Sequence, residues 1–456
     1  MYHAENWKQK LILFLHVLWP ILVVQVGYMA MNLVDTMMSG RAGTDDLAGV
    51  AIGSSLWMPI SIGLNGIMLA VTPIVAQLYG KGDRSRITFS VTQALYLAVV
   101  ISLIIIGIGS QTLENILQIM GLAPEVHYIA KHYLIGLSIG IVPLFMANVL
   151  RYFFDAQGLT KITMVILLMA IPFNMLLNYL LIFGKLGFPR LGGIGAGYTT
   201  GFTYWVILFF SIWMTFKLDA IRPYRLFTTW ITPSWKAWKK QLAIGVPMGL
   251  SIFFEASIFS AVTLLMGKLF DTTTIAAHQA ASTFTNLLFM VPLSISMALT
   301  IFVAYELGSG RRTAALHYTR LGVGGALAIM TICAVALYFV REPVAWIYTD
   351  DPAVVTLIKS FLIFAMIYQL SDASQAALQG VLRGYKDTTI PFIIALISYW
   401  AIGIPSGFWL AVNTRLGPYG FWVGITLGLT CAALGFAVRL LQVQRKFRSK
   451  TIKAAS

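Results

Sequence analysis

The chain consists of long apolar stretches separated by short polar segments. Stretches such as 98–109, 164–171 and 392–397 contain no charged residue. A helix needs about 20 mostly apolar residues to cross the ~30 Å hydrocarbon layer of a bilayer. Because the apolar runs are continuous rather than alternating, they favour helices over the strands of a barrel. The pattern predicts twelve membrane-spanning helices, at residues 12–38, 47–79, 88–110, 128–150, 162–183, 192–216, 242–267, 274–306, 315–340, 354–380, 388–411 and 417–440.

The composition agrees with a chain that has lipid as its main solvent. Of the 456 residues, 58% are hydrophobic and only 11% are charged. Globular domains carry about 25% charged residues, and so few charges cannot cover the surface of a soluble domain of this size. We therefore expect an all-α membrane protein in contact with a lipid bilayer.

The basic residues indicate how the chain is oriented. There are 32 lysines and arginines against 17 acids, and if both termini are cytoplasmic the inner loops receive 24 of the basic residues and the outer loops 8. This asymmetry is the positive-inside pattern. It predicts a multi-pass protein of a bacterial inner (cell) membrane with both termini cytoplasmic. No nucleic-acid partner is expected, because the basic residues are not clustered on one folded face together with aromatic residues that could stack on nucleobases.

The two halves of the sequence repeat one design. The segment from Val75 to Arg84 resembles the segment from Val303 to Arg312, about 228 residues later, and Pro20 meets Pro247 at nearly the same offset. An even number of helices in each repeat gives both halves the same orientation. We predict two pseudo-symmetric six-helix bundles, with an N-terminal lobe at 1–216, a cytoplasmic linker at 217–241, and a C-terminal lobe with a basic tail at 242–456.

Three acids remain inside the predicted spans after the loop charges are assigned: Asp35, Glu255 and Asp372. A charged carboxylate at the bilayer centre costs ~3 kcal/mol by insertion scales. Lys359 is counted with the outer loops, and no other lysine or arginine within the same spans offers a permanent partner. Each acid is therefore expected to bind a proton, an inorganic cation or a cationic substrate. Asp35 lies near the outer end of its helix, so an interfacial acid that reaches water is the alternative there.

Polar and aromatic neighbours surround these acids at helical spacing. Asn174 and Asn178 stand one turn apart and present both amides on one face, and Tyr368 precedes Asp372 by one turn. The alternative role of the two asparagines is hydrogen bonding between helices. The alternative for Tyr368 is an interfacial or packing aromatic. Phe259, one turn after Glu255, is either a ring face for a cation or a core aromatic. Gln279 is a weaker candidate for substrate contact.

Motifs for chemistry or nucleotide binding are missing from the sequence. It contains no HExxH, CxxC pair, Walker loop or nucleophile elbow. We therefore expect a protein that is not an enzyme, has no cofactor, and is not powered directly by ATP.

Together, these residues resemble a known family. Pro20, the run Asn32-Leu33-Val34-Asp35-Thr36 and Gly40 are similar to the first helix of the multidrug and toxic compound extrusion (MATE) family. The runs Phe254-Glu255-Ala256-Ser257 and Leu370-Ser371-Asp372-Ala373 resemble the acids of helices 7 and 10 in its NorM-like branch. The resemblance implies a V-shaped pair of bundles and a multidrug efflux antiporter. Such a protein exports cationic amphiphilic drugs and dyes against Na⁺ or H⁺ by alternating access.

The resemblance also implies roles for individual residues. Glu255, Asp372 and Tyr368 match a cation site that suits Na⁺, and Asp35, Asn174 and Asn178 match a pocket in the first lobe. We expect cation coupling at the three acids and Tyr368, small organic cations as substrates, and a monomer. The bend that Pro20 allows in the first helix is our candidate for a conformational hinge.

Two other transporter classes remain open at this stage. A lipid-linked oligosaccharide flippase of the same superfamily has the same broad shape but needs a basic cavity for pyrophosphate. A major-facilitator symporter also has six plus six helices, yet its repeats do not place acids in this way.

Overall fold

The part of the chain described by the computed structural model, residues 3–455, forms helices joined by turns and loops and contains no strand. Eleven of its helices are long and apolar enough to cross a membrane, and a bent pair of shorter helices gives the twelfth span. The predicted all-α membrane fold is confirmed. Most of the helices are several residues longer at their ends than the predicted spans.

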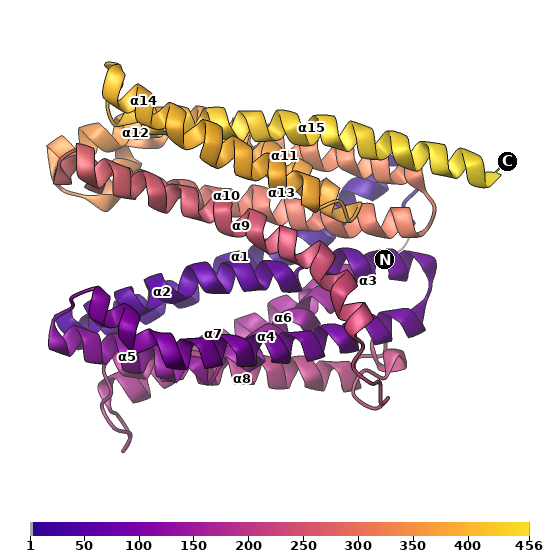
Figure 1. The fold of residues 1–456 in the computed structure, drawn as a ribbon, viewed down its shortest axis with the longest axis horizontal. Helices are drawn as coiled ribbons and strands as arrows, with labels where there is room; N and C mark the ends of the chain where they lie inside the picture. Colours follow the sequence, from indigo (N-terminus) through magenta and orange to yellow (C-terminus); the bar gives the residue numbers. More distant parts are fainter. Residues whose placement is uncertain (1–2, 456) are drawn as a thin grey trace. The chain divides into compact units, whose positions relative to one another are not determined.

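The contacts within the chain divide it into two compact units. The first unit holds Leu15–Val246, and the second holds Ala4–Phe14 together with the chain from Pro247 onwards. Both boundaries fall inside long helices, α1 and α9, rather than in loops. Figure 1 shows the order of the helices along the chain by colour.

The helices of the first unit are joined by short turns. Their bounds are α1 Trp7–Ala42, α2 Thr44–Met68, α3 Val71–Lys81, α4 Arg84–Ile119, α5 Pro124–Ser138, α6 Ile141–Ala156, α7 Thr160–Phe183 and α8 Gly193–Lys217. A three-residue 3₁₀ turn, η1 Arg222–Tyr224, follows α8.

The remaining helices follow η1 along the chain, and the second unit contains them from Pro247 of α9 onwards. Their bounds are α9 Trp235–Leu269, α10 Thr272–Gly308, α11 Arg312–Tyr348, α12 Pro352–Gly384, α13 Thr389–Leu396, the π-helical segment η2 Ile397–Gly403, α14 Ile404–Asn413 and α15 Tyr419–Ala455. Helix α12 packs against α10, α11 and α15. Side chains on α12 are therefore held from three sides.

The fourth predicted span, 128–150, is not one straight helix. It consists of α5 and α6, which are bent by 48° where they meet at Ile139 and Gly140. A Cβ atom on Gly140 would lie 2.6 Å from the Cα atom of Gly201 on α8. The bend is therefore built around a close backbone approach that only glycine permits.

The connection between α8 and α9 is folded against the first unit. Tyr224 is buried and packs edge-on against Phe153, with ring centroids 5.3 Å apart. The side chain of Gln93 donates to the Thr232 carbonyl at 2.8 Å and accepts from the Ser234 N–H at 2.8 Å. These contacts fix the course of the segment that the sequence predicts to be a linker.

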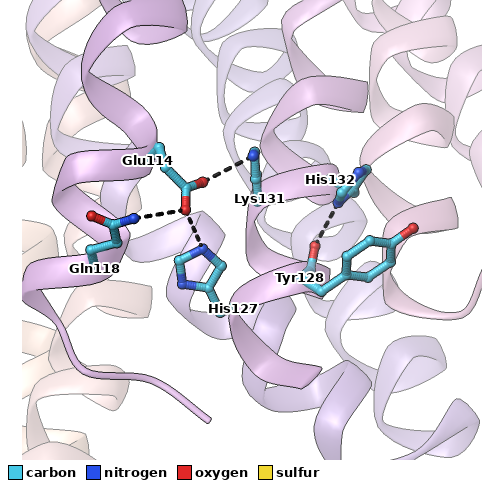
Figure 2. Close-up of polar contacts among 6 residues, drawn as sticks. All are labelled: Glu114, Gln118, His127, Tyr128, Lys131 and His132. Carbon is cyan, nitrogen blue, oxygen red and sulfur yellow. Dashed lines mark hydrogen bonds and ion pairs between the residues drawn. The ribbon is translucent and has the colours of Figure 1, made fainter. Parts of the chain in front are cut away.

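A cluster of polar side chains ties the facing ends of α4 and α5 together (Figure 2). The Glu114 carboxylate contacts the His127 Nε2 at 3.0 Å and the Lys131 Nζ at 2.9 Å. The amide of Gln118 donates to the same carboxylate at 3.4 Å. Because α4 and α5 are joined by a turn of only a few residues, these contacts complete a helical hairpin at this end of the unit.

Candidate functional site

The two acids of the second unit lie together, joined by one amide group. The Nε2 atom of Gln375 donates to Glu255 Oε1 at 2.8 Å and to Asp372 Oδ1 at 2.9 Å. Asp372 and Gln375 stand one turn apart on α12, while Glu255 comes from α9. Asp372 is buried, and Glu255 is partly exposed. The structure thus brings together the two acids that the family resemblance places in one cation site.

Aromatic rings surround Asp372 on the side of Tyr368. The Tyr368 hydroxyl donates a hydrogen bond to the Asp372 carboxylate, and its ring meets Phe259 edge-on at 5.9 Å between centroids. Trp422 of α15 packs against the other side of Tyr368 at 5.5 Å. Tyr368 is therefore part of the acid cluster, and Phe259 supports it as a packing partner.

Tyr399 is a member of this cluster that sequence reasoning missed. Its hydroxyl donates to Gln375 Oε1 at 2.9 Å, so both ends of the Gln375 amide are engaged. Tyr399 lies in the π-helical segment η2. Wider π-helical turns shift the register of a helix and occur frequently at functional sites. The ordinary 3.6-residue period could not place this hydroxyl.

The predicted span of Glu255 holds no basic partner, but a basic residue from beyond the end of another predicted span acts on this acid. Arg383, at the end of α12, acts on the Glu255 carboxylate through its Coulombic field, and its side chain is buried. The predicted span ends at residue 380, but the helix continues to Gly384 and carries the guanidinium with it. Two carboxylates and one guanidinium carry a net charge of −1 when all three are ionised. One monovalent cation would neutralise this group.

Asp35 is buried in the first unit rather than placed at a water-facing surface. Its Oδ1 atom accepts from Asn178 Nδ2 at 2.6 Å, and its Oδ2 atom accepts from Thr200 Oγ1 at 3.1 Å. Asn174 Oδ1 in turn accepts from the same Asn178 amide at 3.1 Å. The predicted trio of Asp35, Asn174 and Asn178 is thus brought together, and Thr200 of α8 is an addition.

The Asp35 group differs from the second-unit cluster in its charge balance. Within residues 3–455, no lysine, arginine or histidine lies within ion-pair distance of Asp35. The Oδ1 atom of Asn178 is buried and has no hydrogen-bond partner in this range. A carboxylate and an unused amide oxygen in one buried group form an acceptor-rich site, which suits a cation or a proton.

The first unit also holds a buried charge pair that lies outside the predicted spans. Arg151 and Asp155 lie on α6, beyond the predicted span end at residue 150, and both are buried. The Arg151 Nε atom is 3.6 Å from Asp155 Oδ2, and Thr163 donates to Asp155 at 3.2 Å. The two charges balance each other, and we assign this pair no place in the acceptor-rich group around Asp35.

Two predicted site residues, Gln279 and Pro20, are not part of either acid centre. Gln279 lies on an exposed face of α10, and within residues 3–455 its side chain makes no hydrogen bond to Glu255 or Asp372. Pro20 is buried inside α1, which continues through it without a break. The missing N–H of a proline removes one helical hydrogen bond there, which leaves a local weak point in the helix.

Comparison with known proteins identifies the family. The family model described as MatE matches the chain twice, at residues 20–180 and 247–409. The two matches begin at Pro20 and Pro247, the same prolines that the internal repeat aligns. The repeat and the family model therefore divide the sequence in the same way.

Relatives of the whole chain carry one description. A protein of Halalkalibacterium halodurans described as a probable multidrug resistance protein NorM is 51% identical over 444 residues, which is 97% of each chain. A protein of Bacillus subtilis with the same description is 46% identical over 450 residues, which is 99% of each chain.

Solved structures have the same fold. The eukaryotic MATE transporter AtDTX14 superposes with a TM-score of 0.85 at 20% identity and covers 97% of this chain and 99% of its own. The Vibrio cholerae MATE transporter VcmN in its bent form gives a TM-score of 0.86 at 19% identity, over 95% of this chain and 97% of its own. From its sequence relatives, its family match and its fold, the chain belongs to the MATE family of multi-pass membrane transporters.

Proposed function

We propose that the chain is a multidrug efflux antiporter. It exports cationic amphiphilic drugs and dyes in exchange for Na⁺ or H⁺, by alternating access. The observation that carries the proposal is the presence of two acid centres, one around the buried Asp35 and one around Glu255 and the buried Asp372, each held within its own unit.

Electrostatics gives these centres a way to couple ion and drug. A carboxylate in a low-dielectric site is stabilised by any cation that reaches it, whether a proton, Na⁺ or an organic cation. The centre formed by Glu255, Asp372 and Arg383 has a net charge of −1 when all three groups are ionised, so a second cation gains less than the first. The arrival of the ion therefore lowers the affinity for the drug, which is the requirement for exchange.

The ligand chemistry separates the two centres. Glu255, Asp372 and Tyr368 offer hard oxygen atoms from three side chains, which are the ligands that alkali and alkaline-earth cations accept. Asp35 is a single carboxylate held by amide and hydroxyl donors, which suits a proton. We infer Na⁺ coupling at the second-unit centre, with proton coupling as the competing assignment.

The relatives support this choice over the other transporter classes. Curated relatives of the full chain are described as probable multidrug resistance proteins. Membership of the MATE family excludes the major-facilitator alternative, and it makes the protein a transporter rather than an enzyme. Among residues 3–455, the two buried arginines, Arg151 and Arg383, each have an acid nearby, which argues against a basic cavity for the pyrophosphate of a lipid-linked oligosaccharide.

Ethidium efflux from proteoliposomes with an imposed Na⁺ or pH gradient tests the proposal. We expect Asp372→Asn and Glu255→Gln each to reduce ion-driven efflux by more than about tenfold, since a change of ~1.4 kcal/mol in ion binding is tenfold in its equilibrium constant. The matched control is Glu342→Gln, because Glu342 is an exposed acid paired with Lys359 at 3.4 Å. Its efflux should equal that of the unaltered protein.

The proposal fails if both variants, reconstituted in equal amounts, drive efflux at the unaltered rate under either gradient. A loss of efflux in Glu342→Gln as large as in the other two would also contradict it, because the effect would then follow any lost acid rather than the cluster.

A further inference from the structure

The α8–α9 connection, residues 218–234, holds a cavity that is separate from both acid centres. Its volume is about 440 Å³. Its apolar lining residues, here called the apolar wall, are Phe216, Leu226 and Phe227, and its exposed charged lining residues, here called the rim, are Arg222, Arg225 and Asp219. The rings of Phe216 and Phe227 lie 6.1 Å apart, so the apolar wall is continuous.

The arginines on the rim are not equivalent. Arg222 is occupied, because it donates to the carbonyls of Phe216 and Lys217 at 3.2 and 3.1 Å and pairs with Asp219 at 3.1 Å. Arg225 is exposed, and its side chain has no hydrogen-bond or ion-pair partner among residues 3–455. The cavity therefore has one uncompensated guanidinium at its rim.

The apolar wall continues a stripe of exposed aromatic residues along α8. These residues are spaced three or four apart, so they lie on one face of the helix. They are between 44% and 64% exposed, which marks this face as lipid-contacting in a membrane protein. The stripe consists of Phe202, Trp205, Phe209, Trp213 and Phe216. Its last member, Phe216, is also part of the cavity wall.

Exposed aromatic rings and basic side chains lie close in the sequence to the residues that line the cavity. Trp230 is 83% exposed and Trp235 is 64% exposed. Such amphipathic rings gather at the level of lipid headgroups. Six basic residues accompany the single acid Asp219 in and beside the connection, namely Lys217, Arg222, Arg225, Lys236, Lys239 and Lys240. This combination of base and aromatic rings attracts anionic headgroups.

We propose that this cavity is a binding site for one anionic phospholipid. Its phosphate pairs with Arg225, its headgroup occupies the cavity, and its acyl chains lie along the aromatic stripe of α8. The backbone that carries Arg225 is held in place, since the buried Tyr224 beside it accepts from Thr88 Oγ1 at 2.8 Å through its carbonyl. The site is thus preformed, and the proposal does not depend on the transported drug or the coupling ion.

Native mass spectrometry of the full chain in detergent with phosphatidylglycerol or phosphatidylcholine tests the site. The unaltered protein should retain phosphatidylglycerol in preference to phosphatidylcholine. Arg225→Gln should reduce this preference roughly fivefold, the factor for one basic residue at ~1 kcal/mol. Arg415→Gln is the matched control, because Arg415 is an exposed arginine in the loop between α14 and α15, far along the chain from the cavity. Its lipid preference should not change.

Two outcomes would overturn the site. The first is an Arg225→Gln protein that retains phosphatidylglycerol as well as the unaltered one does, while its melting temperature shows that it is folded. The second is displacement of the lipid by millimolar glycerol phosphate, which would identify a site for free phosphate groups rather than for a lipid. The double variant Arg225→Gln with Phe227→Ala should retain the lipid for a shorter time than Arg225→Gln alone. The second substitution removes part of the apolar wall beneath the headgroup.

Discussion

One amide side chain links all the polar groups in the second-unit centre. Gln375 donates to both acids and accepts from Tyr399, so its orientation is fixed at both ends. Two carboxylates that share one NH₂ group repel each other when both are charged. A bound cation relieves this repulsion, and Gln375 sets the distance over which the two acids can share it.

Tyr399 is expected to act as a positioning residue for this centre. Tyr399→Phe removes the donor to Gln375 Oε1 and leaves a buried amide oxygen unpaired, which costs about 1–3 kcal/mol. We predict a several-fold increase in the Na⁺ concentration for half-maximal efflux, with maximal efflux retained. Titration of efflux against Na⁺ in proteoliposomes measures this shift.

The control for this variant is Tyr179→Phe, which alters an exposed tyrosine of α7 in the other unit. It should leave the half-maximal Na⁺ concentration unchanged. A lower melting temperature in Tyr399→Phe with an unshifted Na⁺ dependence would show that the hydroxyl has only a structural role.

The acids themselves could be predicted from the sequence, but their partners could be predicted only in part. Buried charge is rare enough in apolar spans that Asp35, Glu255 and Asp372 stand out without any structure. One-turn spacing also places Tyr368 beside Asp372. By contrast, Thr200 and Arg383 reach their acids from other helices or from beyond the predicted helix end, and no local period reports such contacts.

At the scale of elements, glycines allow α8 to pack closely in the first unit. A Cβ atom on Gly197 would overlap the carbonyl oxygen of Tyr133 on α5, and one on Gly195 would lie 2.8 Å from the backbone of Leu181 on α7. Small residues allow membrane helices to approach closely where no hydrophobic effect drives them together. Thr200, which reaches Asp35, lies one turn after Ala196 on this closely packed helix.

Gly197→Ala is therefore expected to destabilise the first unit. The added methyl group cannot fit without moving α5 away from α8, and overpacking of this kind costs about 1–3 kcal/mol. Thermal unfolding in detergent should show a lower melting temperature. Gly107→Ala is the control, because a Cβ atom there meets nothing within 4 Å. A melting temperature in Gly197→Ala equal to that of the control would contradict the close packing.

The helices also show which features of the structure the hydrophobic pattern predicts and which it does not. Apolar length locates every span, because the bilayer imposes the same requirement on each. It does not detect the 48° bend between α5 and α6 or the π-helical segment η2, because both preserve apolar composition while changing backbone geometry. Gly140 and Pro143 are local signals for the bend, but isolated glycines and prolines are frequent in this chain and most of its helices continue through them.

At the scale of the whole molecule, the repeat supplies two related halves with different polar contents. The family model matches from Pro20 and again from Pro247, so both halves follow the same structural pattern. Yet Asp35 is held by amide and hydroxyl donors without a basic partner in ion-pair distance among residues 3–455, whereas the Glu255 and Asp372 pair has Arg383 nearby. A shared fold therefore carries two sites of different charge, which can take different cations.

This difference predicts that the two centres can be separated by mutation. Calorimetric titration of the purified protein with Na⁺ should show binding in Asp35→Asn close to that of the unaltered protein, because the Na⁺ ligands of the second unit are untouched. Asp372→Asn should weaken Na⁺ binding by about tenfold or more, equivalent to ~1.4 kcal/mol, since it removes one of two anionic ligands. Both variants should nevertheless lose coupled efflux if each centre is needed for exchange. Loss of Na⁺ binding in Asp35→Asn, with binding preserved in Asp372→Asn, would instead place the Na⁺ site in the first unit and leave the proton to Glu255 and Asp372.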